Sequence, residues 1–414
     1  MCTVIFISTD YFDIGSEEGL LHFFLRRRTM TMHLHTARNL SACQATLPDR
    51  RVPNALLHRE TVQRILVIKL RHFGDVLLMT PLLSTLRANY PHALIDVLVY
   101  DGTEAMLAGN RDVYLAYTVD RDLKHRRLKA QYRGEYALWN SLRTGHYDLV
   151  INLSDQWRAA LYCRFLKPTF SLGFRYPKRN NRLWQSCHSL LVDVADALQH
   201  TVLNNLGILA PLALPTRITN VTQAWRPCDV DEVDRLSRRH HLTDFVLIQP
   251  TARWAFKTWT VEGFSAVINH LTAQGKTVVL TGGRSLGEAA MINAIMAACL
   301  SPQRVANLTG RLDLPELAVL ISRARLFIGV DSVPMHMAAA LKTPSVVLFG
   351  PSNLAQWSPW QAPHTLLWAG DYRPLPSPDT IDTHTTEHYL SAIPVSDVIA
   401  AVDRQLSVAS VFVS

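Results

Sequence analysis

The stretch LVIKLRHFGDVLLMTPLL, residues 66–83, joins two apolar runs through the short polar segment RHFGD. The first run is rich in β-branched residues, as in a buried strand, and the second has the composition of a helix. Gly74 permits a tight turn and a close approach of the backbone, and Asp75 follows it at or near the helix N-cap. A strand, a polar turn and a helix in this order are typical of a sheet of parallel strands.

The same alternation continues on both sides of a proline-rich stretch at residues 206–221, which we interpret as a linker. Residues 363–392 are predicted to be rich in loops. The predicted strands are 64–70, 93–100, 147–153, 245–250, 277–283, 325–330 and 345–350. The predicted helices include 76–90, bent or restarted at Pro81, 260–275, with Thr260 as N-cap and Gly275 as its stop, and 394–406.

These elements predict an α/β protein with two doubly wound halves. Residues 1–60 show no sustained periodicity, so we expect a disordered leader or a start site assigned too far upstream. The predicted organisation is a leader at 1–60, an N-terminal domain at 61–222, a C-terminal domain at 223–393, and a terminal helix with its tail at 394–414.

Composition limits the classes of protein that fit this chain of 414 residues. No run of 18 apolar residues exists, so no membrane span is predicted. The six cysteines form no C-x-x-C pair, which argues against a zinc site or a disulfide framework and favours a reducing compartment. The net charge of +8 implies an anionic partner: nucleic acid, an anionic membrane or a phosphorylated substrate.

Asp75 has two interpretations from the sequence. It is a helix-capping aspartate, or it is a carboxylate at the mouth of a cleft that takes a proton from a hydroxyl group. Ligands of open α/β sheets bind at the carboxyl ends of the strands, where Asp75 is expected to lie. The glycine pattern G-x-G-x-x-G of dinucleotide-binding proteins is absent at this turn.

The second half carries a candidate phosphate site. Asp331 and Ser332 precede a helix with Pro334 in its first turn, and the N-terminus of a helix attracts anions. His336 lies one turn further and either faces the same anion or packs in the core. Thr251, Arg253 and Lys257 follow the first strand of this half and bring cations that can neutralise a departing diphosphate. Thr281, Gly282 and Gly283 end the next strand and can pass close to a nucleotide.

Taken together, these segments resemble glycosyltransferase family 9, the ADP-heptose:lipopolysaccharide heptosyltransferases. The resemblance runs from about residue 64 to 406. The segments that carry it are IKLRHFGDVLLMTP, PTARWAFKTW, LTGRLDLPEL, GVDSVPMHMAAAL and FGPS. The forms KLRHFGDVLLMTP and AIPVSDVIAAVD are most similar to the heptosyltransferase III branch, which adds the side-branch heptose of the inner core.

This resemblance implies a GT-B fold, with two Rossmann-like domains facing each other across a cleft. It implies an inverting transfer without a metal or other cofactor, in which Asp75 is the general base and Lys257 acts at the leaving diphosphate. Glu288 is a candidate for a glutamate that the family has near the adenosine. The implied donor-binding residues are Thr251, Arg253, Thr281, Gly282, Gly283, Asp331, Ser332, Val333, Met335 and His336.

The excess positive charge gathers in two stretches, 123–133 and 164–184, each with six basic residues. They are either solvated surface or a lip that meets the phosphates and carboxylates of nascent lipopolysaccharide at the cytoplasmic face of the inner membrane. No nucleic-acid-binding motif accompanies them. The predicted acceptor-binding residues are Arg71, His72, Gly74, Arg126, Arg127, Arg175 and Arg179.

Three other functions compete with this interpretation. The same scaffold can serve another acceptor, as in heptosyltransferases I and II, or take another nucleotide sugar. A nucleotide-sugar epimerase with the same two-domain plan would convert the donor in the absence of an acceptor. A binding protein without catalytic activity is the third, and the presence of Asp75 together with Lys257 argues against it.

Overall fold

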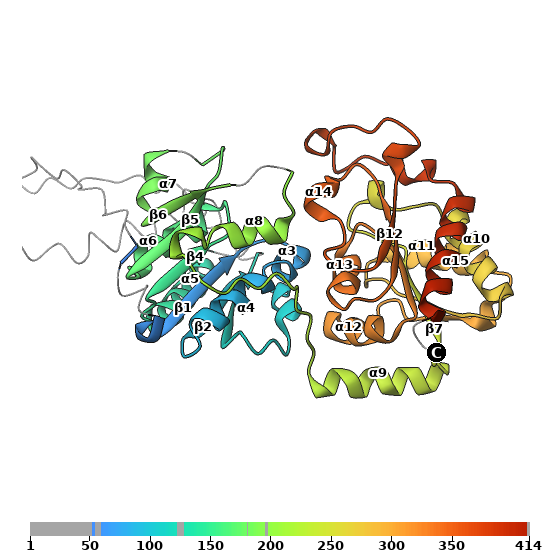
Figure 1. The fold of residues 1–414 in the computed structure, drawn as a ribbon, viewed down its shortest axis with the longest axis horizontal. Coiled ribbons are helices and arrows are strands. Elements are labelled where there is room, and N and C mark those ends of the chain that lie inside the picture. The colour runs from blue at the N-terminus through green and yellow to red at the C-terminus, as the bar shows by residue number, and fades with distance from the viewer. Residues whose placement is uncertain (1–51, 54–58, 122–127, 180, 195–197, 412–414) are drawn as a thin grey trace, which may run out of the picture.

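The computed structural model describes residues 52–53, 59–121, 128–179, 181–194 and 198–411, without the side chains of 128–132 and 408–411. The predicted leader at 1–60 lies almost entirely outside the described residues. Figure 1 shows two lobes, one in blue and green and one in yellow to red, with α9 (Pro227–His240) running beneath the second. In the part of the chain described, no helix combines the length and apolarity needed to cross a membrane.

The first lobe is a six-stranded parallel sheet in the order β3-β2-β1-β4-β5-β6. Side chains alternate between its two faces, which is why its strands are apolar throughout. Ile65 and Val67 pack on the face of the sheet that α4 covers. Leu66 and Ile68 pack on the opposite face, against α5 and α6. The strands are β1 (Arg64–Lys69), β2 (Leu94–Tyr100), β3 (Leu115–Val119), β4 (Leu149–Asn152), β5 (Phe170–Arg175) and β6 (Leu190–Asp193). The helices are α3 (Phe73–Leu77), α4 (Thr80–Asn89), α5 (Leu128–Arg143), α6 (Trp157–Leu166), α7 (Arg182–Ser186) and α8 (Thr201–Gly207).

The second lobe repeats this topology with the order β12-β11-β10-β7-β8-β9. Its strands are also buried on both faces, because α12 and α13 cover one side and α10, α11 and α15 cover the other. The strands are β7 (Phe245–Gln249), β8 (Thr277–Leu280), β9 (Val305–Asn307), β10 (Leu326–Val330), β11 (Ser345–Phe349) and β12 (His364–Trp368). The helices are α10 (Val261–Ala273), α11 (Leu286–Ala297), α12 (Leu314–Arg323), α13 (Val333–Ala340), α14 (Leu354–Trp357) and α15 (Val395–Val411).

The topology places the two predicted sites at equivalent positions. The strand order reverses beside β1 in the first sheet and beside β7 in the second, and ligands bind at such switch points. Asp75 follows β1, and the loop that contains Lys257 follows β7. The α/β fold class predicted from the sequence is confirmed, and the predicted domain boundaries stay a prediction.

Several predicted elements need correction. Residues 363–392 are rich in loops, as predicted, and β12 adds an edge strand to the second sheet there. The predicted linker at 206–221 contains the end of α8 and a 3-10 helix, η4 (Ala210–Leu212). Its later part is fixed along α4, where Asn89 Nδ2 donates to the carbonyl of Thr216 at 2.7 Å. The strands β3, β5, β6 and β9 were not predicted.

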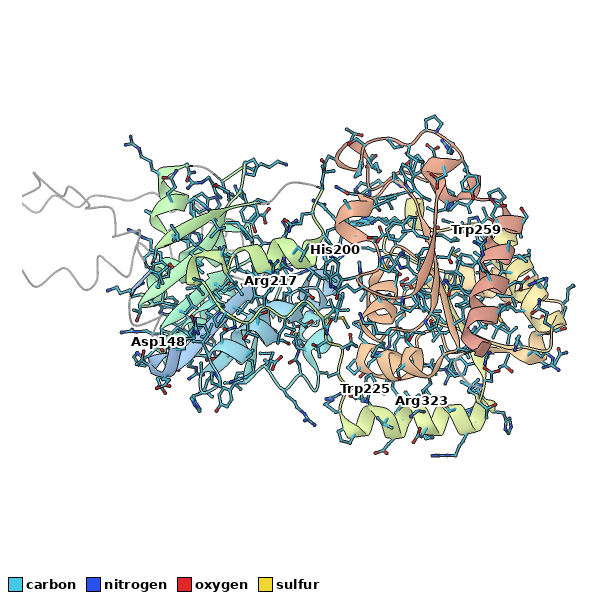
Figure 2. All side chains as sticks on the ribbon, viewed as in Figure 1. Asp148, His200, Arg217, Trp225, Trp259 and Arg323 are labelled. Atoms are coloured by element: carbon cyan, nitrogen blue, oxygen red, sulfur yellow. The ribbon has the colours of Figure 1, made fainter. Side chains whose placement is uncertain are left out.

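The two lobes touch each other directly. One cluster of buried apolar side chains includes residues of α3 and α4 as well as of α12 and α13. Near α14, His200 Nε2 lies 3.0 Å from the carbonyl oxygen of Ser358, and its ring stacks on Trp360 at 4.4 Å. Figure 2 labels His200 on the side of the first lobe that faces the second. These contacts fix the relative position of the two lobes, which together line the cavity described next.

Candidate active site

A cavity of about 1520 Å³ is lined by residues of both lobes. The first lobe contributes α3 with its preceding loop, and the second contributes the loops after β7, β8 and β10. Thirteen of the predicted site residues line this one cavity. They are His72, Gly74, Asp75, Thr251, Arg253, Lys257, Thr281, Gly282, Gly283, Asp331, Ser332, Val333 and His336.

Asp75 is the third residue of α3 and His72 is the N-cap, so Asp75 lies near the N-cap, as predicted. Its carboxylate reaches back to the start of the helix, where Oδ2 accepts a hydrogen bond from the backbone N–H of His72 at 3.3 Å. The other oxygen lies 3.8 Å from Nζ of Lys69 at the end of β1. The carboxylate is partly exposed and borders the cavity, as a group that takes a proton from a bound hydroxyl must.

Gly74 lies at a close contact between the lobes. A Cβ at this position would lie 3.3 Å from Cδ2 of His336, which belongs to α13 of the second lobe. The backbone of Gly74 is helical, so the tight turn expected there does not require a glycine. The residue is therefore explained by the packing of His336 against α3.

Lys257 ends the 3-10 helix η5 (Ala255–Lys257) in the loop after β7. Its Nζ donates to Oδ2 of Asp331 at 2.5 Å, and Ser352 Oγ donates to the same oxygen at 2.5 Å. Asp331 is buried and Lys257 is mostly buried, so the pair is shielded from water. An ammonium held in this way can turn from Asp331 to a phosphate oxygen in the cavity.

The N-terminus of α13 borders the cavity beside this pair. Ser332 is its N-cap, and Pro334 in the first turn removes one backbone donor. Ser332 Oγ and His336 Nδ1 are both buried, and neither makes a hydrogen bond within the described residues. Burial lowers the pKa of His336 to about 4, so its ring is neutral at physiological pH. Two unpaired polar atoms at a helix N-terminus are suited to bind an anionic ligand.

A hydrogen-bond network forms the far wall of the cavity. Glu288, near the start of α11, accepts from the hydroxyl of Thr251 at 2.6 Å and from the backbone N–H of Gly283 at 2.8 Å. Gln249 Nε2 donates to Thr251 Oγ1, and Thr281 Oγ1 donates to Gln249 Oε1. The structure thus brings Glu288 next to the predicted site residues Thr251, Thr281 and Gly283.

Positive groups from both lobes meet at His72. Arg253 Nη1 from the second lobe lies 2.9 Å from His72 Nδ1, and Arg121 Nη2 from the first lobe lies 3.4 Å from the same atom. Burial, Arg253 and Arg121 lower the pKa of His72. Arg121 was missed from the sequence because it follows β3, a strand that was not predicted.

The remaining predicted residues lie elsewhere. Arg71 pairs with Asp155 at 3.1 Å, and Arg179 Nε donates to the carbonyl oxygen of Asp155. Arg175 pairs with Asp193 at 2.9 Å. Met335 is fully buried in the core. None of these four residues borders the cavity, and Arg126 and Arg127 lie outside the described residues.

The arrangement suits group transfer between two substrates. A carboxylate lies on one wall, and a buried ammonium with a helix N-terminus lies on the other. Within the described residues, no group of three or more His, Cys, Asp or Glu side chains is arranged to hold a metal ion. The predicted lack of a metal or cofactor stays a prediction.

Comparison with known proteins identifies relatives over most of the chain. Residues 135–387 match the family model described as glycosyltransferase family 9 (heptosyltransferase). The chain is 39% identical over 340 residues to lipopolysaccharide heptosyltransferase 3 of Escherichia coli, an alignment that covers 81% of this chain and 97% of the relative.

Two solved structures share the fold. The family 9 glycosyltransferase from Veillonella parvula DSM 2008 superposes with a TM-score of 0.71 at 23% identity, covering 83% of this chain and 97% of that one. The E. coli ADP-heptose lps heptosyltransferase II superposes with a TM-score of 0.67 at 22% identity, covering 83% and 99%. These superpositions confirm the predicted GT-B fold.

Proposed function

The chain belongs to glycosyltransferase family 9, and from that premise we propose that it transfers L-glycero-D-manno-heptose from ADP-heptose to a heptose of the lipopolysaccharide inner core. The similarity to lipopolysaccharide heptosyltransferase 3, over nearly the whole length of that relative, favours this substrate pair. One observation of the structure carries the proposal. Asp75 of the first lobe and Lys257 of the second line the same cavity, as an acceptor base and a donor cation must.

The donor is assigned to the second lobe. Lys257, the N-terminus of α13 and the unpaired polar atoms of Ser332 and His336 favour the diphosphate at that place. The network around Glu288, with Thr281, Gly282 and Gly283, is assigned to the nucleoside. Val333 borders the same region. Met335 is assigned no direct contact with the donor, because it is buried in the core.

The reaction is an inverting displacement at the anomeric carbon. The acceptor hydroxyl oxygen forms a bond to that carbon while the bond to the β-phosphate oxygen breaks, and its electron pair leaves with ADP. Asp75 receives the proton of the hydroxyl. Charge that develops on ADP is stabilised by Lys257 and the α13 N-terminus, so the protein needs no metal for this step. Base and leaving group lie on opposite faces of the sugar, and a cleft between two lobes supplies that geometry.

The acceptor is assigned to the first lobe and to the positive groups near His72. Arg121 and Arg253 supply charge beside Asp75, and Arg71 lies just outside the cavity. The basic residues Arg126, Arg127, Arg175 and Arg179 are assigned to a more distant contact with phosphates and carboxylates of nascent lipopolysaccharide. Such a contact would hold the enzyme at the cytoplasmic face of the inner membrane.

Mass spectrometry of the reaction products tests the proposal. Purified protein is mixed with ADP-L-glycero-β-D-manno-heptose and truncated core acceptors, each with and without its second heptose. Addition of one heptose only when the second heptose is present is the expected result. Transfer to the shorter acceptor would assign the protein to the heptosyltransferase I or II type. A changed donor in the absence of any acceptor would replace the transferase with an epimerase or a hydrolase.

A further inference from the structure

Lys69 is a buried lysine that the proposed mechanism does not yet use. It is the last residue of β1, directly before the loop that leads to Asp75. Its side chain is only 7% exposed, and it does not line the cavity. Burial lowers its pKa, and the nearby carboxylate of Asp75 opposes that shift. A buried ammonium is costly, so its presence at this position needs a compensating role.

The position of the ammonium is fixed from the opposite side by Asn205. Lys69 Nζ donates to Asn205 Oδ1 at 3.1 Å, and both residues are buried. The amide of Asn205 cannot turn freely, because its Nδ2 donates to the carbonyl oxygen of Leu78 at 3.1 Å. Asn205 therefore presents an acceptor to Lys69 and leaves other N–H groups of the ammonium available to Asp75.

We infer that Lys69 is a positioning residue for Asp75, whose carboxylate it holds in place and aims into the cavity. The ammonium lies 3.8 Å from Asp75 Oδ1, while Oδ2 is held by the backbone of His72. An opposite charge at this distance favours the ionised form of a carboxylate. The inference rests on the proposed function, because it gives Asp75 the role of base.

Other groups near the pair do not replace Lys69. The titratable and charged groups around Lys69 and Asp75 are Arg71, His72, Arg121, Asp155, Tyr176, Arg253 and His336. Arg71 is paired with Asp155 at 3.1 Å, so its charge is largely neutralised. Burial lowers the pKa of both histidines, which makes them neutral near pH 7, and it raises the pKa of Tyr176. Arg121 and Arg253 lie against the ring of His72, whereas Lys69 contacts the Asp75 carboxylate from the end of β1.

The proton balance defines what Lys69 does in the reaction. The acceptor hydroxyl gives its proton to Asp75, which then leaves the carboxyl neutral beside an ammonium that keeps its charge. The proton then passes to water, which restores the carboxylate for the next turnover. Lys69 itself neither gains nor loses a proton in this scheme.

The test substitution is Lys69→Met, which keeps the length of the side chain and removes the charge. Without the ammonium, the protonated carboxyl persists to higher pH, so the acidic limb of the kcat/KM profile should move up by about one pH unit or more. Turnover at pH 7 should fall by about 10- to 100-fold. Affinity for ADP should stay within about twofold of the wild type, because Lys69 does not border the cavity.

A matched control is Lys276→Met. Lys276 lies 3.9 Å from Asp244, so it forms an ion pair of similar length far from the cavity, and its loss should not move the pH profile. A second variant, Asn205→Ala, keeps both charges and loosens the ammonium, and it should lower kcat with a smaller shift of the acidic limb. In an Asp75→Asn background, Lys69→Met should cause no further loss of turnover.

The outcomes separate this inference from the proposed function. If the wild type transfers heptose and Lys69→Met is folded with an unshifted acidic limb, the inference is wrong while the proposed function stands. If Lys69→Met does not fold, Asn205→Ala is measured both in the wild type and in the Asp75→Asn background. An equal fractional loss of turnover in the two backgrounds would overturn the inference. If the wild type transfers no heptose to any acceptor, the proposed function fails first.

Discussion

Replacing Gly283 by alanine tests the assignment of the nucleoside to the wall around Glu288. A Cβ on Gly283 would lie 2.5 Å from Oε1 of Glu288, well inside contact distance. The carboxylate must then turn away, which breaks its hydrogen bonds to the backbone N–H of Gly283 and to Thr251 Oγ1. The backbone of Gly283 does not have a positive φ, so the clash is the main effect of the substitution.

The size of the effect follows from the hydrogen bond to the nucleoside that the displaced Glu288 carboxylate can no longer make. A hydrogen bond to a charged group contributes about 1.5–3 kcal/mol. Glu288 is half-buried, so hydrogen bonds to water compensate for part of the lost free energy. We therefore expect a net loss of binding free energy close to that of one hydrogen bond. Each 1.4 kcal/mol corresponds to about a tenfold change in affinity. The affinity for ADP should therefore fall by roughly 10- to 100-fold.

Isothermal titration calorimetry with ADP measures this loss, and a thermal melt checks that the variant is folded. Gly207→Ala is the matched control, because a Cβ on Gly207 meets no atom within 4 Å and the residue lies away from the cavity. A folded Gly283→Ala protein that binds ADP within twofold of the wild type would refute the placement of the nucleotide against Glu288.

Three further substitutions and one pH dependence test the other parts of the site. Asp75→Asn should fold normally, bind ADP normally and lose about 100-fold or more of its turnover; normal turnover in a folded variant would remove Asp75 as the base. Lys257→Met should weaken ADP binding and lower kcat by about 100-fold, and adding Asp331→Asn should restore part of the ADP affinity in calorimetry because it removes a buried carboxylate that has lost its cation. Gly74→Val should raise KM and lower kcat in steady-state assays by pushing His336 away from α3, whereas unchanged kinetics would show that this contact is not needed. The pKa of His336 is lowered to about 4 in the folded protein, so its stabilising contribution is complete above about pH 6.5 and is lost as pH falls toward 4. The total is roughly 3 kcal/mol, and His336→Gln should flatten this part of the pH–stability curve measured by urea unfolding.

The sequence predicted most of the strands whose two faces are both buried, but it missed β5. β1 and β7 are short apolar runs without alternation, which is the pattern of a central parallel strand. β3 was missed because its first residues are exposed, and an exposed strand end lacks the apolar run that marks a buried one. β12 was missed for a similar reason, since it is only partly buried at the edge of the second sheet and begins with His364.

The candidate site was predictable where one motif contains the residues, and not where tertiary structure brings them together. Asp75 and Lys257 each belong to a recognisable segment after a strand. Arg121 could be recognised only with knowledge of β3, and the role of Gly74 depends on His336, which lies 262 residues later along the chain and in another lobe. In the sequence, Lys69 is a polar residue at the end of an apolar strand. Only its position beside Asn205 and Asp75 in the structure indicates a role.

The ion pair between Lys257 and Asp331 explains how the site keeps a strong cation without a ligand. An isolated ammonium in this mostly buried position would be destabilising, and Asp331 compensates for its charge. Ser352 donates to the same carboxylate oxygen, so Asp331 keeps one partner when the lysine turns to a phosphate. A diphosphate that binds Lys257 therefore replaces only one of the two hydrogen bonds that the Asp331 carboxylate accepts. When the donor binds, Lys257 moves from Asp331 to a phosphate oxygen, and when ADP leaves, Lys257 returns to Asp331.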